Sequence, residues 1–125
     1  MKTLECGQGV FWVRENDNTN LFNNFIDKGI RMIGHMDISP KEERANHYHK
    51  NFIEIICVVK GKLRIKLYMP DNPSEVSEIV LSRGDEITIL PPLAHSFKSD
   101  DGAIALEYSP HNYTTADSFK VDFDW

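Results

Sequence analysis

The feature that most constrains the fold is a succession of short extended runs separated by turn residues, with no long helix between them. Residues 63–67 form the clearest run: three apolar side chains alternate with Arg and Lys, as in a strand with one face in the core and the other in water. Glycine, proline, asparagine and aspartate separate the runs. Eight or more such strands predict an all-β protein, either a sandwich or a barrel.

The same pattern places the individual elements. Gly34 falls on the apolar face of its run and leaves room there. Residues 21–26 have the spacing of a short helical turn, and residues 60–62 are expected to turn the chain between two strands. The aromatic tail, residues 119–125, is a last strand or a docked extension. The other extended runs are residues 10–13, 30–38, 55–59, 75–81, 87–90, 95–98 and 103–108.

Length and composition limit what the chain can be. Its 125 residues predict one domain, residues 1–125, and the hydrophobic fraction of 41% is that of an ordinary globular protein. A net charge of -5 with scattered Lys and Arg excludes a nucleic-acid partner. No apolar run reaches the roughly 18 residues of a membrane span, and no signal peptide is recognisable, so we expect a cytoplasmic protein. Cys6 and Cys57 are expected to be reduced thiols.

One short stretch carries the chemistry. His47 and His49 are two residues apart, so in an extended segment both imidazoles leave the same face, while Tyr48 points the other way. Glu54 can join them only if the chain turns at residues 50–52, which predicts a hairpin. Two neutral imidazoles and a carboxylate suit one divalent ion such as Fe, Ni, Mn, Zn or Cu. The sequence therefore predicts one metal ion per chain.

The spacing His47-x-His49-x4-Glu54-x6-Gly61 resembles the first motif of the cupin superfamily, and residues 84–95 resemble the second. Both motifs lie within about residues 41–98. The resemblance implies a double-stranded β-helix, which is a small jelly-roll barrel. It also implies a fourth metal ligand, His95, which spacing alone does not identify. The sequence departs from the motifs at turn positions rather than at ligands, namely Lys41, Pro92 and Ser99.

Residues 44–50 and 58–62 resemble the small cupins associated with nucleotide-sugar and polysaccharide biosynthesis. That resemblance implies an enzyme that isomerises or epimerises a keto-sugar held in the barrel, with an imidazole or tyrosine as acid or base. A bound metal would instead polarise the carbonyl. Two alternatives remain open. One is a metal-dependent dioxygenase, in which four ligands around Fe leave two open positions; the other is a sensor cupin that only binds a small molecule.

Three further residues are candidates for contact with a substrate. Tyr48 either faces a second sheet or a subunit partner, or acts as an acid at the barrel mouth. His35 shares a face with Arg31 and Asp37, so it lies on a polar face or lines the pocket. Arg44 precedes the ligands and could contact a phosphate or carboxylate. Residues 10–13 and the aromatic tail predict a homodimer formed by sheet pairing or stacking.

Overall fold

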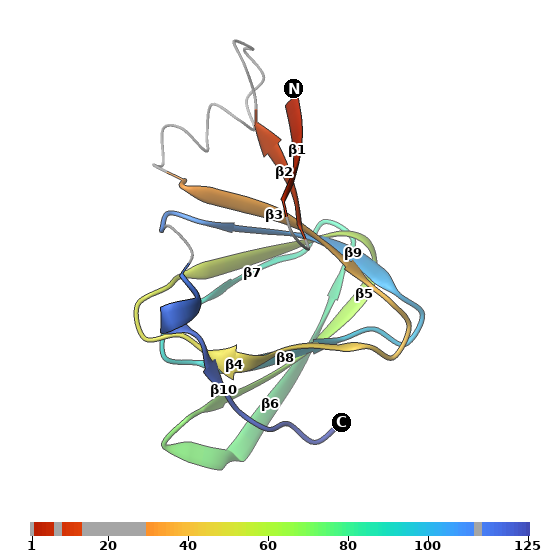
Figure 1. The fold of residues 1–125 in the computed structure, drawn as a ribbon. Coiled ribbons are helices and arrows are strands. Elements are labelled where there is room, and N and C mark those ends of the chain that lie inside the picture. The colour runs from red at the N-terminus through yellow and green to blue at the C-terminus, as the bar shows by residue number, and fades with distance from the viewer. Residues whose placement is uncertain (1, 7–8, 14–29, 112–113) are drawn as a thin grey trace.

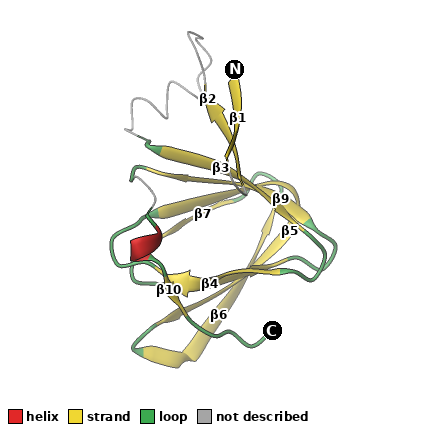
Figure 2. Ribbon diagram, in the orientation of Figure 1, coloured by secondary structure: helices red, strands yellow, loops and turns green. Residues whose placement is uncertain are grey.

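The structure is a computed structural model that describes residues 2–6, 9–13, 30–111 and 114–125 (Figure 1). These residues form strands and one turn of 3-10 helix, shown in red in Figure 2. In chain order the elements are β1 (Lys2–Cys6), β2 (Gly9–Val13), β3 (Met32–Ile38), β4 (Glu43–Tyr48), β5 (Glu54–Met69), β6 (Asn72–Ser82), β7 (Glu86–Ile89), β8 (Ala94–Lys98), β9 (Ala103–Ser109), η1 (Thr115–Asp117) and β10 (Phe119–Lys120).

The strands β3 to β10 form two facing layers that curl into a barrel (Figure 1). One layer has the order β7, β5, β9 and β3, and the other has β6, β5, β8, β4 and β10. All of these pairings are antiparallel. The all-β jelly-roll barrel expected from the sequence is confirmed. Strands β1 and β2 pair with each other in a separate two-stranded sheet.

Strand β5 belongs to both layers. Its first part pairs with β7 and β9, and its second part pairs with β6 and β8. A register shift between Val58 and Lys60, followed by Gly61 at a φ of +81°, marks the passage. The extra residue changes the alternation, so that Val58 and Leu63 both face the core although they are an odd number apart. The expected turn at residues 60–62 is therefore wrong: the chain bends there within one strand.

The core lies between the two layers and takes side chains from both. Met36 and Ile38 contribute from β3, and Phe97 contributes from β8. Each fully buried aliphatic or aromatic side chain stabilises the fold by roughly 1.5–3 kcal/mol. The remaining core residues are Ile56, Val58, Leu63, Ile65, Leu81, Ile89 and Ala105. The strands predicted along residues 30–38 and 63–67 lie within or overlap β3 and β5, and buried and less buried side chains alternate over residues 36–38 and 63–66.

The connection between β4 and β5 does not form the expected hairpin. The chain does leave the extended conformation at residues 49–53, where a turn was expected. However, β4 pairs with β8 and β10, whereas the adjoining part of β5 pairs with β7 and β9. The two strands belong to opposite layers because each finds a partner far along the chain. The turn is therefore a corner that crosses from one layer to the other.

The C-terminal tail docks on the outer face of its own chain. The Tyr68 hydroxyl donates to the carbonyl oxygen of Asp122 at 3.0 Å, and Nε1 of Trp125 donates to Oγ of Ser96 at 2.8 Å. Three cationic side chains lie over the indole of Trp125, namely Arg64, Lys66 and Lys98. Both expectations for the tail hold, since β10 is a short strand and the residues after it are a docked extension.

Two expectations for the N-terminal part have different outcomes. The strand expected at residues 10–13 is confirmed within β2. The helical turn expected at residues 21–26 lies outside the described residues.

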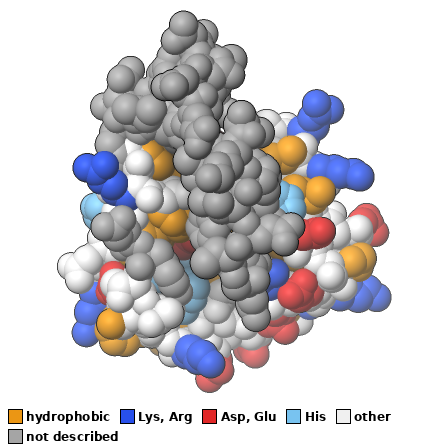
Figure 3. Space-filling model, turned by 45° about the horizontal axis from the view of Figure 1, so that its top comes forward, with side chains coloured by type: hydrophobic (Ala, Val, Ile, Leu, Met, Phe, Trp, Pro, Cys, Tyr) orange, Lys and Arg blue, Asp and Glu red, His pale blue; other side chains and the backbone are white. Residues whose placement is uncertain are grey.

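Figure 3 shows basic and acidic side chains of the described residues interspersed around one face of the molecule, rather than a basic patch. Among the described residues, no helix is long and apolar enough to span a membrane.

Candidate metal centre

Four side chains from three strand regions meet between the two layers of the barrel. His47 on β4 lies opposite His95 on β8 in the antiparallel register, so both imidazoles leave the same face of their layer. His49 follows β4 directly, and Glu54 opens β5 in the other layer. His49, Glu54 and His95 are buried, and His47 is half-buried. The corner between β4 and β5 thus brings Glu54 to the histidines.

The candidate ligand atoms of these four residues all lie within 4.8 Å of one another. Nε2 of His95 is 2.8 Å from Oε2 of Glu54, and Nε2 of His49 is 3.6 Å from the same oxygen. Among the described residues, four buried side-chain atoms lack a hydrogen-bond partner. Three belong to this cluster, namely Nε2 of His47, Nε2 of His95 and Oε2 of Glu54, and the fourth is Oδ1 of Asn46. Buried polar atoms normally have a partner. Buried nitrogen and oxygen atoms that lack a hydrogen-bond partner and face one another fit the ligands of a divalent ion.

The other nitrogen of each imidazole has a polar neighbour. Nδ1 of His49 is 2.6 Å from the carbonyl oxygen of Asp117, and Nδ1 of His95 is 3.0 Å from that of Leu93. Nδ1 of His47 lies 3.3 Å from Oγ of Ser118. A carbonyl oxygen can only accept, so Nδ1 of His49 and of His95 carries the proton and Nε2 keeps its lone pair. Those lone pairs are the ones available to a metal.

The charges of the cluster also suit metal binding. Burial, reinforced by repulsion from His95, lowers the pKa of His47 to about 4, so this imidazole is neutral near pH 7. Burial would raise the pKa of Glu54, but His95 and hydrogen bonds from its neighbours hold it below its ordinary value. Burial opposes the charged form of His49, yet Glu54 and Asp117 raise its pKa, so a metal ion must compete with a proton at this imidazole. A carboxylate and a neutral imidazole are the forms in which these side chains bind metals.

Glu107 on β9 is a site residue that the sequence analysis missed. Burial raises its pKa well above the ordinary value, and the adjacent Glu54 carboxylate, to which Glu107 is hydrogen-bonded, raises it further. Glu107 is therefore held as a neutral acid that donates to Glu54. A signal was present in the sequence, because Glu107 continues the alternation of the buried residues Ala103 and Ala105.

The three candidates for substrate contact are not among the four residues of the cluster. The ring of Tyr48 stacks on Phe119 of the tail with centroids 5.2 Å apart. His35 alternates with the buried Met36 and so faces away from the core. The Arg44 guanidinium lies 3.6 Å from the carboxylate of Glu42, at the charged loop before β4. The structure thus brings together the four expected ligands, and Arg44 lies close enough for its charge to oppose the rise that burial causes in the pKa of Glu107. The roles of the three candidates stay predictions.

The sequence model of the family described as Cupin matches residues 36–125 of this chain. Among solved structures, CapF from Staphylococcus aureus, a capsular polysaccharide assembling protein, is similar with a TM-score of 0.67 and 17% identity, over 74% of this chain and 28% of CapF. QdtA from Thermoanaerobacterium thermosaccharolyticum, a sugar 3,4-ketoisomerase in complex with TDP, has a TM-score of 0.63 and 19% identity, over 73% of this chain and 66% of QdtA.

A third similar structure is that of Drosophila melanogaster CENP-C bound to CAL1. Its TM-score is 0.56 and its identity is 20%, over 61% of this chain and 59% of CENP-C. The present chain spans less than two thirds of each of these three proteins. At identities of this size the likeness shows a shared fold, and one fold can serve several functions.

Proposed function

The chain belongs to the cupin family, and we propose that it is a metal-binding enzyme that isomerises or epimerises a keto-sugar or a similar small polar metabolite. The observation that carries this proposal is the buried group of three imidazoles and one carboxylate between the two layers of the barrel. The shared fold with QdtA, a sugar 3,4-ketoisomerase, supports the choice of reaction and substrate class.

The proposed ligands are His47, His49, Glu54 and His95. A bound divalent ion would supply Lewis acidity, which polarises a carbonyl group and acidifies the carbon next to it. The chain's own residues prepare the site. Glu54 brings a negative charge to the three imidazoles, and Glu107 donates a hydrogen bond to that carboxylate. His47 is the least buried of the four and is therefore the side chain that a substrate can approach.

Moving a proton between two carbons needs a group that accepts it and returns it. The roles that the sequence suggests for Tyr48, His35 and Arg44 are retained as proposals. For Arg44, the structure adds one supporting observation. Its side chain is 34% exposed, so its charge can meet the phosphate or carboxylate of a substrate.

Deuterium exchange tests the proposed reaction. The protein is incubated in D2O with a keto-sugar nucleotide, after removal of metals by a chelator and after reloading with each of the candidate ions. We expect deuterium to appear at the carbon next to the carbonyl, as measured by mass spectrometry, and we expect none with the His95→Ala variant. If neither the chelated nor any reloaded sample catalyses exchange, the isomerase proposal is wrong.

The same ligand set favours a second candidate function. Four ligands around Fe leave two positions of an octahedral ion open, as a dioxygenase requires for its substrate and oxygen. Oxygen uptake that depends on Fe(II) and on an added substrate would support this function over isomerisation. Saturable binding of a small molecule without turnover would instead support a sensor.

A further inference from the structure

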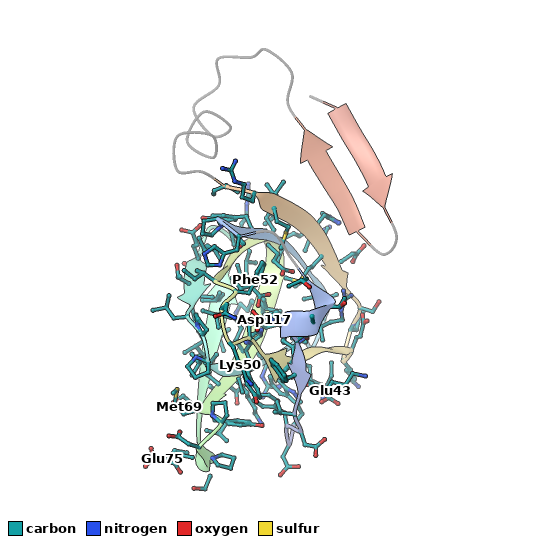
Figure 4. All side chains as sticks on the ribbon, turned by 60° about the vertical axis from the view of Figure 1, so that its left-hand side comes forward. Glu43, Lys50, Phe52, Met69, Glu75 and Asp117 are labelled. Carbon is teal, nitrogen blue, oxygen red and sulfur yellow. The ribbon has the colours of Figure 1, made fainter. Side chains whose placement is uncertain are left out.

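The C-terminal segment of residues 115–118, called the tail turn here, lies against the corner between β4 and β5. It consists of η1 and Ser118 and is far in sequence from both cupin motifs. Figure 1 shows η1 beside this corner, and Figure 4 shows Asp117 next to Phe52 and Lys50. The corner connects two of the proposed ligands, His49 and Glu54, so its conformation sets the distance between them.

The carboxylate of Asp117 binds three consecutive backbone N–H groups of the corner. Its Oδ1 accepts from Lys50 at 2.8 Å, and its Oδ2 accepts from Asn51 and from Phe52, each at 3.0 Å. A charged acceptor strengthens each of these hydrogen bonds. One side chain thereby fixes three adjacent residues between the two ligands.

The tail turn also contacts the ligands themselves. The backbone oxygen of Asp117 accepts from Nδ1 of His49, and Oγ of Ser118 lies 3.3 Å from Nδ1 of His47. The first of these contacts places the proton of the neutral His49 ring on Nδ1 and leaves Nε2, 3.6 Å from Oε2 of Glu54, as the nitrogen that a metal can bind. Partners of this kind orient metal-binding histidines, and their loss typically weakens metal binding by about 10–100-fold.

We propose that the tail turn, and Asp117 above all, positions the ligands of the metal centre and so sets its affinity for divalent ions. The inference rests on the proposed metal centre but not on the proposed reaction. It makes Asp117 a positioning residue, since its side chain binds the corner and not the ion. A part of the chain outside both motifs would thus complete the centre.

The test is to measure Co2+ affinity, by competition with a chelator, together with the visible absorption of the bound Co2+, which reports ligand geometry. We expect Asp117→Ala to weaken binding by about 10–100-fold and to change the spectrum, because loss of the carboxylate releases the corner from the tail turn and so draws the backbone oxygen of residue 117 away from His49. Asp117→Asn should lie between this variant and the wild type, because an amide keeps one acceptor oxygen. Ser118→Ala should weaken binding less, because it removes the contact with His47 alone.

Asp122→Ala is the matched control. Asp122 is in the same tail and contacts the barrel through its backbone oxygen, which the substitution retains. We expect its Co2+ affinity and spectrum to equal those of the wild type. If Asp117→Ala does not fold, the Asp117→Asn and Ser118→Ala variants decide. Unchanged affinity and spectrum in the folded variants would overturn the role of the tail turn alone, whereas a wild-type protein that binds no divalent ion would overturn the metal centre as well.

Discussion

Replacing Gly61 by alanine should reduce the free energy of unfolding by about 3 kcal/mol. Gly61 has a φ of +81°, and an added Cβ would lie 2.5 Å from the carbonyl oxygen of Gly102 and 3.2 Å from Cα of Ala103. Holding alanine at a positive φ costs about 1–2 kcal/mol. The collision is with backbone, so strand β9 must shift, which adds about 1–3 kcal/mol. The lower entropy of the unfolded alanine chain offsets about 0.4–1 kcal/mol.

Two other glycines separate these contributions. Gly84 has a φ of +90° but nothing within 4 Å of an added Cβ, so Gly84→Ala should cost only about 1 kcal/mol. Gly34 in β3 also has open space and no positive φ, so Gly34→Ala should stabilise the protein by about 0.5 kcal/mol. Urea unfolding followed by tryptophan fluorescence gives the three values. If Gly61→Ala lowers the free energy of unfolding no more than Gly84→Ala does, the predicted collision of an added Cβ with the carbonyl oxygen of Gly102 is wrong.

Three further predictions follow from the core, the cluster and the free thiol. Phe97 is 1% exposed, so Phe97→Ala should cost about 3–5 kcal/mol in urea unfolding, and a cost below 1 kcal/mol would contradict its place in the core. His95→Ala should remove the metal found by elemental analysis, and Glu54→Gln should weaken binding less, since the amide oxygen can still coordinate; unaltered metal content in His95→Ala would contradict the assignment. Burial and the nearby carboxylate of Glu86 raise the pKa of the Cys57 thiol. In a Cys6→Ser background, alkylation of Cys57 at pH 8 should therefore be slower than alkylation of free cysteine. The Glu86→Gln substitution should make it faster. Equal rates with and without Glu86→Gln would show that this carboxylate has no effect on the thiol.

The strand pattern of the sequence predicted the fold well where burial is periodic. Residues 63–67 alternate and form the inner and outer faces of β5. The errors concern pairing. Nothing in residues 50–52 indicates that β4 pairs with β8 rather than with β5, because this choice depends on contacts made about fifty residues away. Gly61 predicts a turn, because a turn between two strands and a bend inside one strand both use the positive φ that glycine adopts easily.

The candidate site could be predicted only in part for a similar reason. The spacing of His47, His49 and Glu54 is local and is legible in the sequence, whereas His95 came from a family resemblance. The alternation of its strand indicates that Glu107 faces inward, but not that Glu54 faces it there. Asp117 gives no signal of its own, because the sequence does not show which part of the chain the tail contacts. Their roles come from the packing of β9 and of the tail against distant parts of the chain.

The prediction of a homodimer relied partly on the aromatic tail, which the structure docks on its own sheet. The tail is therefore not a free surface in this chain, and the dimer stays a prediction. Its remaining support from the sequence is the apolar run of residues 10–13 in β2. The exposure of Val76 (49%) and Val80 (55%) on β6 adds to it. A monomeric mass at micromolar concentration would contradict it.

The passage of β5 through both layers has a consequence for how the protein loses its structure. In a barrel made of two separately hydrogen-bonded sheets, one sheet could detach and unfold while the other stayed intact. Here one continuous strand, β5, runs from one layer into the other through the bend at Gly61, so neither layer can unfold without disturbing a strand that the other layer shares. The two layers should therefore melt as one cooperative unit, and partial opening should be confined to the outer strands β3, β6, β7 and β10.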